Sequence, residues 1–186
     1  MGMNFRILHY ETVHSTNNLA RELAGEGAGE GTVVCADYQT RGRGRFKRRW
    51  VSTRGRNLLF SIILRPHFPA SSASIVTHVA AKAVQEVLKE KFGLDARLKR
   101  PNDVLIGKKK IAGILTESCG AGSRLDYMVV GIGLNVNSTA RQIPKRATSV
   151  FIETKAPQDL NTALNYLLIA FGGRYKITCA DYGRKG

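Results

Sequence analysis

Short apolar runs recur along the chain, and because they lack a helical spacing they predict strands. Turns rich in Gly, Lys, Ser and Asn separate the runs. A run at residues 147–153 is expected to form one more strand. The other predicted strands cover residues 5–10, 32–38, 57–64, 96–100, 103–106, 111–118 and 126–137.

Three further segments carry apolar residues three and four positions apart, which predicts amphipathic helices. Ser15 or Thr16 is the expected N-cap of the first helix, and glycine is expected to follow the last residue of each. The predicted helices cover residues 15–24 before Gly25, 71–92 before Gly93, and 157 or 158 to 171 before Gly172 and Gly173.

The order of these elements predicts an α+β domain of the α/β type. Strands come early, lie between helices and pair in hairpins, so we expect a mixed, mostly antiparallel central sheet flanked by helices. A chain of 186 residues without an internal repeat is expected to form one domain. We place this domain at residues 1–173 and a short C-terminal tail at residues 174–186.

The chain is strongly basic, with a net charge of +15 and an isoelectric point of about 10.2. Its hydrophobic fraction of 43% is enough to build a core, so we expect it to fold. The positive charge favours an anionic partner, which would be a nucleic acid, a nucleotide or an acidic protein. Charge by itself does not choose among the three.

The sequence shows no sign of export or of membrane insertion. No run reaches the roughly 18 apolar residues of a membrane span, and the first residues lack the apolar stretch of a signal peptide. The three cysteines are far apart without a C-x-x-C pair, and the four histidines have no metal-binding spacing. Cys35 sits in an apolar run and is expected to be a buried side chain without a nucleophilic role. We therefore expect a cytoplasmic protein without a disulfide framework or a zinc site.

The stretch QTRGRGRFKRRW, residues 39–50, carries the strongest chemical signal, because six of its twelve residues are Arg or Lys. Gly42 and Gly44 let the backbone approach a ligand closely. Arg43 and Arg45 offer forked donors that suit phosphate or carboxylate. The stretch lies between two predicted strands, so it is a loop whose order we expect to come from a bound anion. Taken alone, it fits a phosphate-binding loop and a nucleic-acid-binding segment equally well.

Other polar positions beside apolar strands are less specific candidates. Asn102 and Asp103 follow Pro101 in an ordinary Asx turn, yet their amide and carboxylate also suit Mg²⁺, a ribose or an amine. Lys110 opens a predicted strand, from which its ammonium would reach a carboxylate or a phosphate. Asn135 lies in the apolar run GIGLNVN and therefore needs a hydrogen-bond partner.

Five motifs, taken in order, resemble the catalytic domain of biotin protein ligases. The longest, Q-x-x-G-R-G-R-x-x-R-x-W, is specific, and the others gain weight from their order over residues 5–155. The resemblance implies a class II synthetase-like fold, that of the biotin–lipoate ligase catalytic domain. The motifs are STN at residues 15–17, the long motif at 39–50, K-x-P-N-D at 99–103, K-x-A-G-I-L at 110–115 and G-I-G-x-N-V at 131–136.

By this resemblance, the protein would be an ATP-dependent biotin protein ligase. Biotin and ATP would give biotinyl-5′-AMP and pyrophosphate, and a lysine of a biotin carboxyl carrier protein or domain would then accept the biotin. Mg²⁺ would bind mainly through the ATP phosphates, without a dedicated protein site. The alternatives are a lipoate or octanoate ligase of the same fold, or a non-catalytic biotin-binding or nucleic-acid-binding protein.

The resemblance also implies a role for each matching residue. Arg43, Lys110 and Asp103 would take part in the reaction, with Lys110 at the carboxylate and the α-phosphate. The biotin-binding residues would be Ser15, Thr16, Asn17, Gln39, Gly42, Arg43, Gly44, Arg45, Lys110, Gly113, Gly131 and Gly133. The ATP-binding residues would be Arg43, Arg45, Arg48, Trp50, Asn102, Asp103, Lys110 and Asn135.

The sequence departs from the family pattern in two respects. Residue 100 is Arg where the family usually has Trp, which removes an aromatic surface and adds a charge near the site. We expect neither the family's small C-terminal barrel-like domain nor an N-terminal helix-turn-helix, so no DNA-binding role is expected. Sheets of this kind can pair edge to edge, which would give a homodimer.

Overall fold

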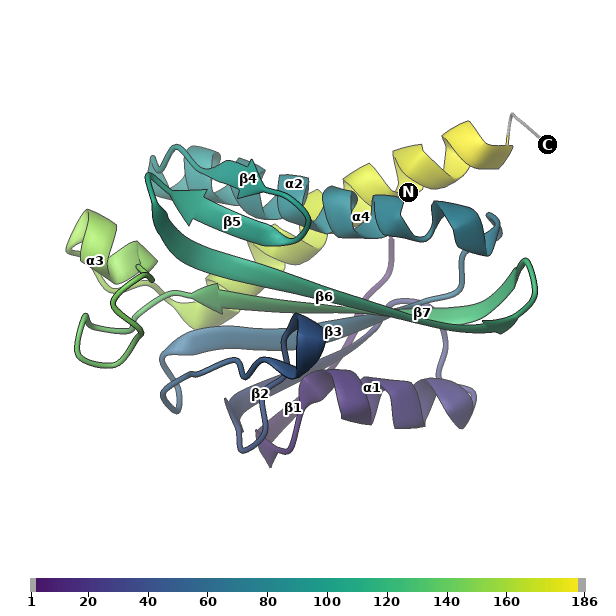
Figure 1. Cartoon of the computed structure of the whole chain (residues 1–186), viewed down its shortest axis with the longest axis horizontal. Helices are drawn as coiled ribbons and strands as arrows, with labels where there is room; N and C mark the ends of the chain where they lie inside the picture. The colour runs from purple at the N-terminus through teal and green to yellow at the C-terminus, as the bar shows by residue number, and fades with distance from the viewer. Residues whose placement is uncertain (1–2, 184–186) are drawn as a thin grey trace.

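The computed structural model describes residues 3–183, which fold around a central seven-stranded sheet (Figure 1). Its strands lie in the order β1-β2-β3-β7-β6-β5-β4. Among these strands only β1 and β2 run parallel, and the other neighbouring pairs are antiparallel. The predicted mixed, mostly antiparallel sheet is therefore confirmed. The strands are β1 (Arg6–Val13), β2 (Thr32–Gln39), β3 (Asn57–Leu64), β4 (Arg97–Lys99), β5 (Asp103–Ile106), β6 (Lys109–Ala121) and β7 (Arg124–Asn135).

Helices cover both faces of this sheet. The long helices α2 (Ser74–Phe92) and α4 (Leu160–Gly183) contact each other and cover one face, while α1 (Thr16–Gly25) packs on the other (Figure 1). The short helix α3 (Val150–Thr154) follows the segment after β7, and two 3-10 turns, η1 (Arg45–Lys47) and η2 (Ala70–Ser72), lie in loops. No helix formed by residues 3–183 is long and apolar enough to cross a membrane.

The alternation of side chains along β7 separates a core face from a site face. Every second residue is apolar and belongs to the main core, which α2 and α4 cover. Gly131 and Gly133 occupy the alternate positions, on the face that carries α1. The strand thus builds the core with one face, and its glycines let other side chains approach the backbone closely on the other. The core residues are Met128, Val130, Ile132 and Leu134.

Two predictions from the sequence were wrong near the C-terminus, one on the type of an element and one on the end of a helix. The segment predicted as a strand at 147–153 forms α3, because the Ser149 hydroxyl accepts a hydrogen bond from Ile152 N at 3.1 Å and caps a helix. Helix α4 was expected to stop at Gly172-Gly173 but runs on to Gly183. Gly172 is a packing site, since a Cβ there would lie 3.1 Å from the Phe5 ring, while a Cβ on Gly173 would meet no atom within 4 Å.

Contacts beyond the glycine pair explain why α4 continues. Arg174 Nε donates to Glu86 of α2 at 2.6 Å, and the buried Tyr175 hydroxyl lies 3.0 Å from Glu30. At α1 the expected boundary also shifts slightly, because Gly25 is still helical and Gly27 takes the left-handed conformation instead. Tertiary contacts thus override the local glycine signal in α4, whereas in α1 a glycine ends the helix two residues later than expected.

Candidate functional site

A cleft of about 370 Å³ opens on the sheet face that carries α1. Its walls come from the start of α1, the Arg-rich loop of residues 39–50, the turn between β4 and β5, and strands β6 and β7. All five sequence motifs therefore meet in one place. The expected site residues that line it are Ser15, Thr16, Asn17, Gln39, Arg43, Gly44, Arg45, Arg48, Trp50, Asn102, Asp103, Lys110, Gly113, Gly131 and Gly133.

Two expected residues lie outside this lining. Gly42 borders a hollow of about 750 Å³ on another side of the loop, where its neighbours include Arg43 and Glu117. Asn135 is 3% exposed, and its Nδ2 donates to Thr148 O at 2.9 Å. The Asn135 side chain thus donates to a backbone carbonyl, and this hydrogen bond ties the segment after β7 to the strand.

The first turn of α1 forms one polar end of the cleft, and Gln39 at the end of β2 holds it in place. Gln39 Oε1 accepts the Thr16 N–H at 2.8 Å and the Thr16 hydroxyl at 3.2 Å. Ser15 is the N-cap residue as predicted, but its side chain makes no capping bond. The carboxamide of a neighbouring strand therefore satisfies the helix N-terminus.

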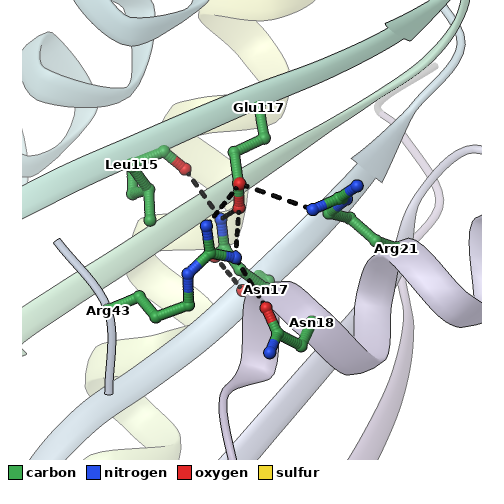
Figure 2. A network of polar contacts seen from close by, with 7 residues as sticks. Asn17, Asn18, Arg21, Arg43, Leu115 and Glu117 are labelled. Atoms are coloured by element: carbon green, nitrogen blue, oxygen red, sulfur yellow. Dashed lines mark hydrogen bonds and ion pairs between the residues drawn. The ribbon is translucent and has the colours of Figure 1, made fainter. Parts of the chain in front are cut away.

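Asn17 links this end to the strands of the sheet (Figure 2). Its Nδ2 donates to Leu115 O at 3.1 Å and to Glu117 Oε2 at 2.9 Å, and its Oδ1 lies 2.7 Å from the Ser61 hydroxyl. A Cβ on Gly131 would overlap the Asn17 side-chain oxygen. The glycine that was expected to make room for a ligand makes room for Asn17.

The Arg-rich loop folds as a narrow hairpin beside the cleft. Gly44 N donates to Arg48 O at 2.7 Å and Trp50 N donates to Gly42 O at 3.0 Å, with η1 at the tip. A Cβ on Gly42 would lie 2.6 Å from Trp50 O, so a larger residue there would push the two arms apart. Phe46 at the tip is 80% exposed and has a left-handed φ of 54°, a costly conformation for a residue with a Cβ.

Trp50 fills the middle of the site with its indole ring. Gly113 of β6 and Gly133 of β7 pair across the sheet, and the ring lies against both. A Cβ on Gly133 would be 2.6 Å from Trp50 Cε2, and one on Gly113 would be 3.0 Å from Cζ3. Within residues 3–183, the buried Trp50 Nε1 has no hydrogen-bond partner. The two glycines thus form a flat platform for an aromatic wall.

Lys110 brings a positive charge to the same wall. Its Nζ is 2.6 Å from Asp103 Oδ1 and 5.3 Å from the centre of the Trp50 ring. The backbone of Lys110 is bonded on both sides, donating to Arg146 O at 2.9 Å and accepting from Thr148 N at 2.8 Å. Lys110 is therefore held inside the fold, unlike a mobile lysine of a solvated turn.

The turn between β4 and β5 forms the opposite wall. Asn102 Nδ2 donates to Ile114 O at 2.8 Å, and Ile114 N donates to Asn102 O at 3.0 Å. This pairing fits the structural interpretation of the Asn-Asp turn, while Asp103 still faces Lys110. Arg100, at the position where the family usually has Trp, lines the cleft and is exposed.

Comparison with known proteins agrees with this geometry. Residues 10–135, more than half of the chain, match the model of the "Biotin/lipoate A/B protein ligase family". The chain belongs to this family. The fold and the family membership predicted from the five motifs are therefore confirmed.

Relatives and solved structures within the family extend over most of the chain. The "Bifunctional ligase/repressor BirA" of Bacillus subtilis is 37% identical over 94% of this chain and 55% of its own. The "Biotin--[acetyl-CoA-carboxylase] ligase" of Paracoccus denitrificans is 39% identical over 91% of this chain and 72% of its own. The structure of the biotin protein ligase from Aquifex aeolicus in complex with biotin and ATP superposes with a TM-score of 0.79 at 31% identity, over 94% of this chain and 72% of that one. The chain thus spans about half of the length of the Bacillus relative.

The family motifs missed two residues that organise the site, Ser61 of β3 and Glu117 of β6. Ser61 is fully buried between the side chains of Thr16 and Asn17. Glu117 accepts bonds from α1 and from the Arg-rich loop. Counting by two along the strand from Gly113 would have placed Glu117 on the site face, since alternate residues share a face.

Proposed function

We propose that the chain activates biotin with ATP and transfers it to a lysine of a biotin carboxyl carrier protein or domain. One observation carries this proposal: residues of all five motifs line a single cleft, and they supply it with polar, aromatic and cationic side chains. Its volume of about 370 Å³ lies in the range of small-ligand sites.

The polar, aromatic and cationic side chains of the cleft suit the ureido ring of biotin, its aliphatic chain, and its carboxylate together with the ATP phosphates. The hydroxyls and amides of the α1 end offer donors and acceptors to a ureido ring. The Trp50 indole, on its glycine platform, offers an apolar surface to an aliphatic chain. Lys110 and the loop guanidiniums of Arg45 and Arg48 offer positive charge to a carboxylate and to phosphates.

The first chemical step joins two anions and therefore depends on charge neutralisation. A biotin carboxylate oxygen attacks the α-phosphorus of ATP, the bond to the β-phosphate oxygen breaks, and pyrophosphate leaves. Lys110 would face the charge that builds up on the transferring group, and the Arg-rich loop would cover the intermediate and limit its hydrolysis. Asp103 lies 2.6 Å from the Lys110 ammonium and so keeps it directed into the cleft.

In the second step, the acceptor lysine amine attacks the carbonyl carbon of biotinyl-5′-AMP, an amide bond forms, and AMP leaves. When Lys110 turns to phosphate, the Asp103 carboxylate is free to meet the incoming amine. The net charge of +15 favours an acidic carrier domain as the partner. The cytoplasm as the compartment and a homodimer both stay predictions.

Mg²⁺ would enter with the phosphates of ATP and offset their charge. The cleft suits such an ion, because Asp103 offers the carboxylate oxygen that Mg²⁺ prefers. Among residues 3–183, no group of three His, Cys, Asp or Glu side chains is close enough to share a metal ion.

Exchange of labelled pyrophosphate into ATP, with and without biotin, tests the proposal. Exchange that needs biotin is the expected result, because the first step is reversible. Exchange that needs lipoate or octanoate would replace biotin by the other substrate class of the family. Absence of both, with salt-dependent binding of a nucleic acid, would contradict the ligase function.

A further inference from the structure

The Arg43 guanidinium contacts a carboxylate of the protein, although the sequence suggested that it would meet a ligand anion. Its Nη2 is 2.8 Å from Glu117 Oε1, and its Nη1 is 3.2 Å from Glu117 Oε2 (Figure 2). Asn18 Oδ1 accepts from the same Nη1 at 2.6 Å. The anion that Arg43 binds in this structure is therefore the Glu117 carboxylate.

Glu117 stands where three elements meet. Besides Arg43 from the loop, its carboxylate accepts the Asn17 amide of α1 at 2.9 Å, and Arg21 of α1 lies 3.7 Å away (Figure 2). The Glu117 side chain is only 20% exposed, while that of Arg43 is 39% exposed. A carboxylate that accepts forked guanidinium donors and an amide is fixed in orientation as well as in charge.

The loop needs such an anchor. Six of the twelve residues from 39 to 50 are Arg or Lys, so the loop repels itself, and Phe46 at its tip has an unfavourable left-handed backbone. Among the side chains that the structure describes in this loop, Arg43 is the one that makes an ion pair with the sheet. The loop nevertheless forms a wall of the cleft.

We propose that Glu117 is a positioning residue that fixes the Arg-rich loop as a wall of the cleft and at the same time orients Asn17 at its polar end. This assignment rests on the proposed function only for its effect on turnover. In this assignment, Arg43 anchors the loop to the sheet. Arg45, Arg48 and Lys110 bind the ligand anions. Glu117 would therefore act on substrate retention and have little effect on the chemical step.

The replacement Glu117→Gln tests the anchor without any ligand, because it keeps the shape of the side chain and removes its charge. Trypsin cuts after Arg and Lys, so the rate of cutting between residues 44 and 50 reports how often the loop leaves the sheet. We expect about a tenfold faster cut, since a charge-assisted pair at a partly exposed site is lost. Trypsin also cuts after Lys108 and Lys109, where β5 joins β6. The rate of this second cut, in the same sample, reports any general loosening of the fold and should stay unchanged.

Three further variants make the test specific. Arg21→Gln removes a cation that faces the same carboxylate but belongs to α1, so it should leave the loop cut at the wild-type rate. Arg43→Gln should be cut as fast as Glu117→Gln, and the double variant should be no faster than either, because both residues belong to one contact. Wild-type cutting in Glu117→Gln, or additive effects in the double variant, would overturn the anchor.

The steady-state constants KM and kcat distinguish a positioning residue from a purely structural one. In biotin-dependent exchange, we expect Glu117→Gln to raise KM for biotin by about tenfold while kcat stays within about twofold, because the groups that face the reacting atoms are untouched. Equal losses in kcat and kcat/KM would assign Glu117 to the chemical step and overturn the positioning role. If the wild-type protein lacks exchange, the proposed ligase function fails, and the protease experiment still decides the role of Glu117.

Discussion

Replacing Lys110 by Ala separates the chemical role of this residue from its structural one. The change removes an ammonium that lies 2.6 Å from Asp103 and 5.3 Å from the Trp50 ring centre. It leaves in place the backbone bonds to Arg146 and Thr148, because those involve main-chain atoms. The fold around the site should therefore survive the change.

The expected magnitudes for stability and for activity differ widely. The side chains of Lys110 and Asp103 are 34% and 30% exposed, so the pair is solvent-screened. Its loss should cost about 0.2–1 kcal/mol of folding free energy. For a chain of this length, this lowers the melting temperature by at most about 4 °C. Removing a charge that faces the transition state typically costs about 2.7–4 kcal/mol, which is a 100- to 1,000-fold loss of rate.

Biotin-dependent pyrophosphate exchange and thermal unfolding, measured on the same preparation, check both numbers. Lys109→Ala is the matched control, since Lys109 is the exposed first residue of β6 and the variant should keep wild-type exchange. Exchange by Lys110→Ala within about tenfold of wild type would refute the catalytic role, because a lost transition-state contact costs more than that. A drop in melting temperature large enough to unfold the variant at the assay temperature would also refute the reasoning.

Three further predictions concern other parts of the molecule. Arg43→Gly should release biotinyl-5′-AMP about tenfold faster in a single-turnover experiment, because the loop loses its contact with the sheet, and unchanged release would contradict this. Gly131→Ala should destabilise the protein by about 1–3 kcal/mol in urea unfolding and weaken biotin binding, since the new methyl group overlaps the Asn17 side chain. Burial raises the pKa of the Cys35 thiol to about 11, so at pH 8 iodoacetamide should modify the exposed Cys119 well before the buried Cys35. Reaction at Cys35 should rise as the pH approaches 11, and equal rates for both thiols at pH 8 would be the contrary result.

Much of the candidate site was predictable, because its motifs are local. Asn57–Leu64 of β3 was predicted to the residue, since a short, mainly apolar run between polar loops is typical of a buried strand. Fifteen of the residues named from the motifs line one cleft. The role of Arg43 was different, because its partner Glu117 lies 74 positions away in the sequence. No local pattern indicates which of several guanidiniums a distant carboxylate will hold.

The sequence by itself determined the seven strands of the sheet, the long helix α2 and the family, since apolar periodicity and motif order are properties of neighbouring residues. Tertiary structure decided where α4 ends, because Arg174 and Tyr175 beyond the glycine pair make contacts with distant residues, and Gly172 packs against Phe5. It also decided what occupies the glycine platform of β6 and β7, where the Trp50 ring lies. Glycine permits a close approach, but only the folded chain determines which group approaches.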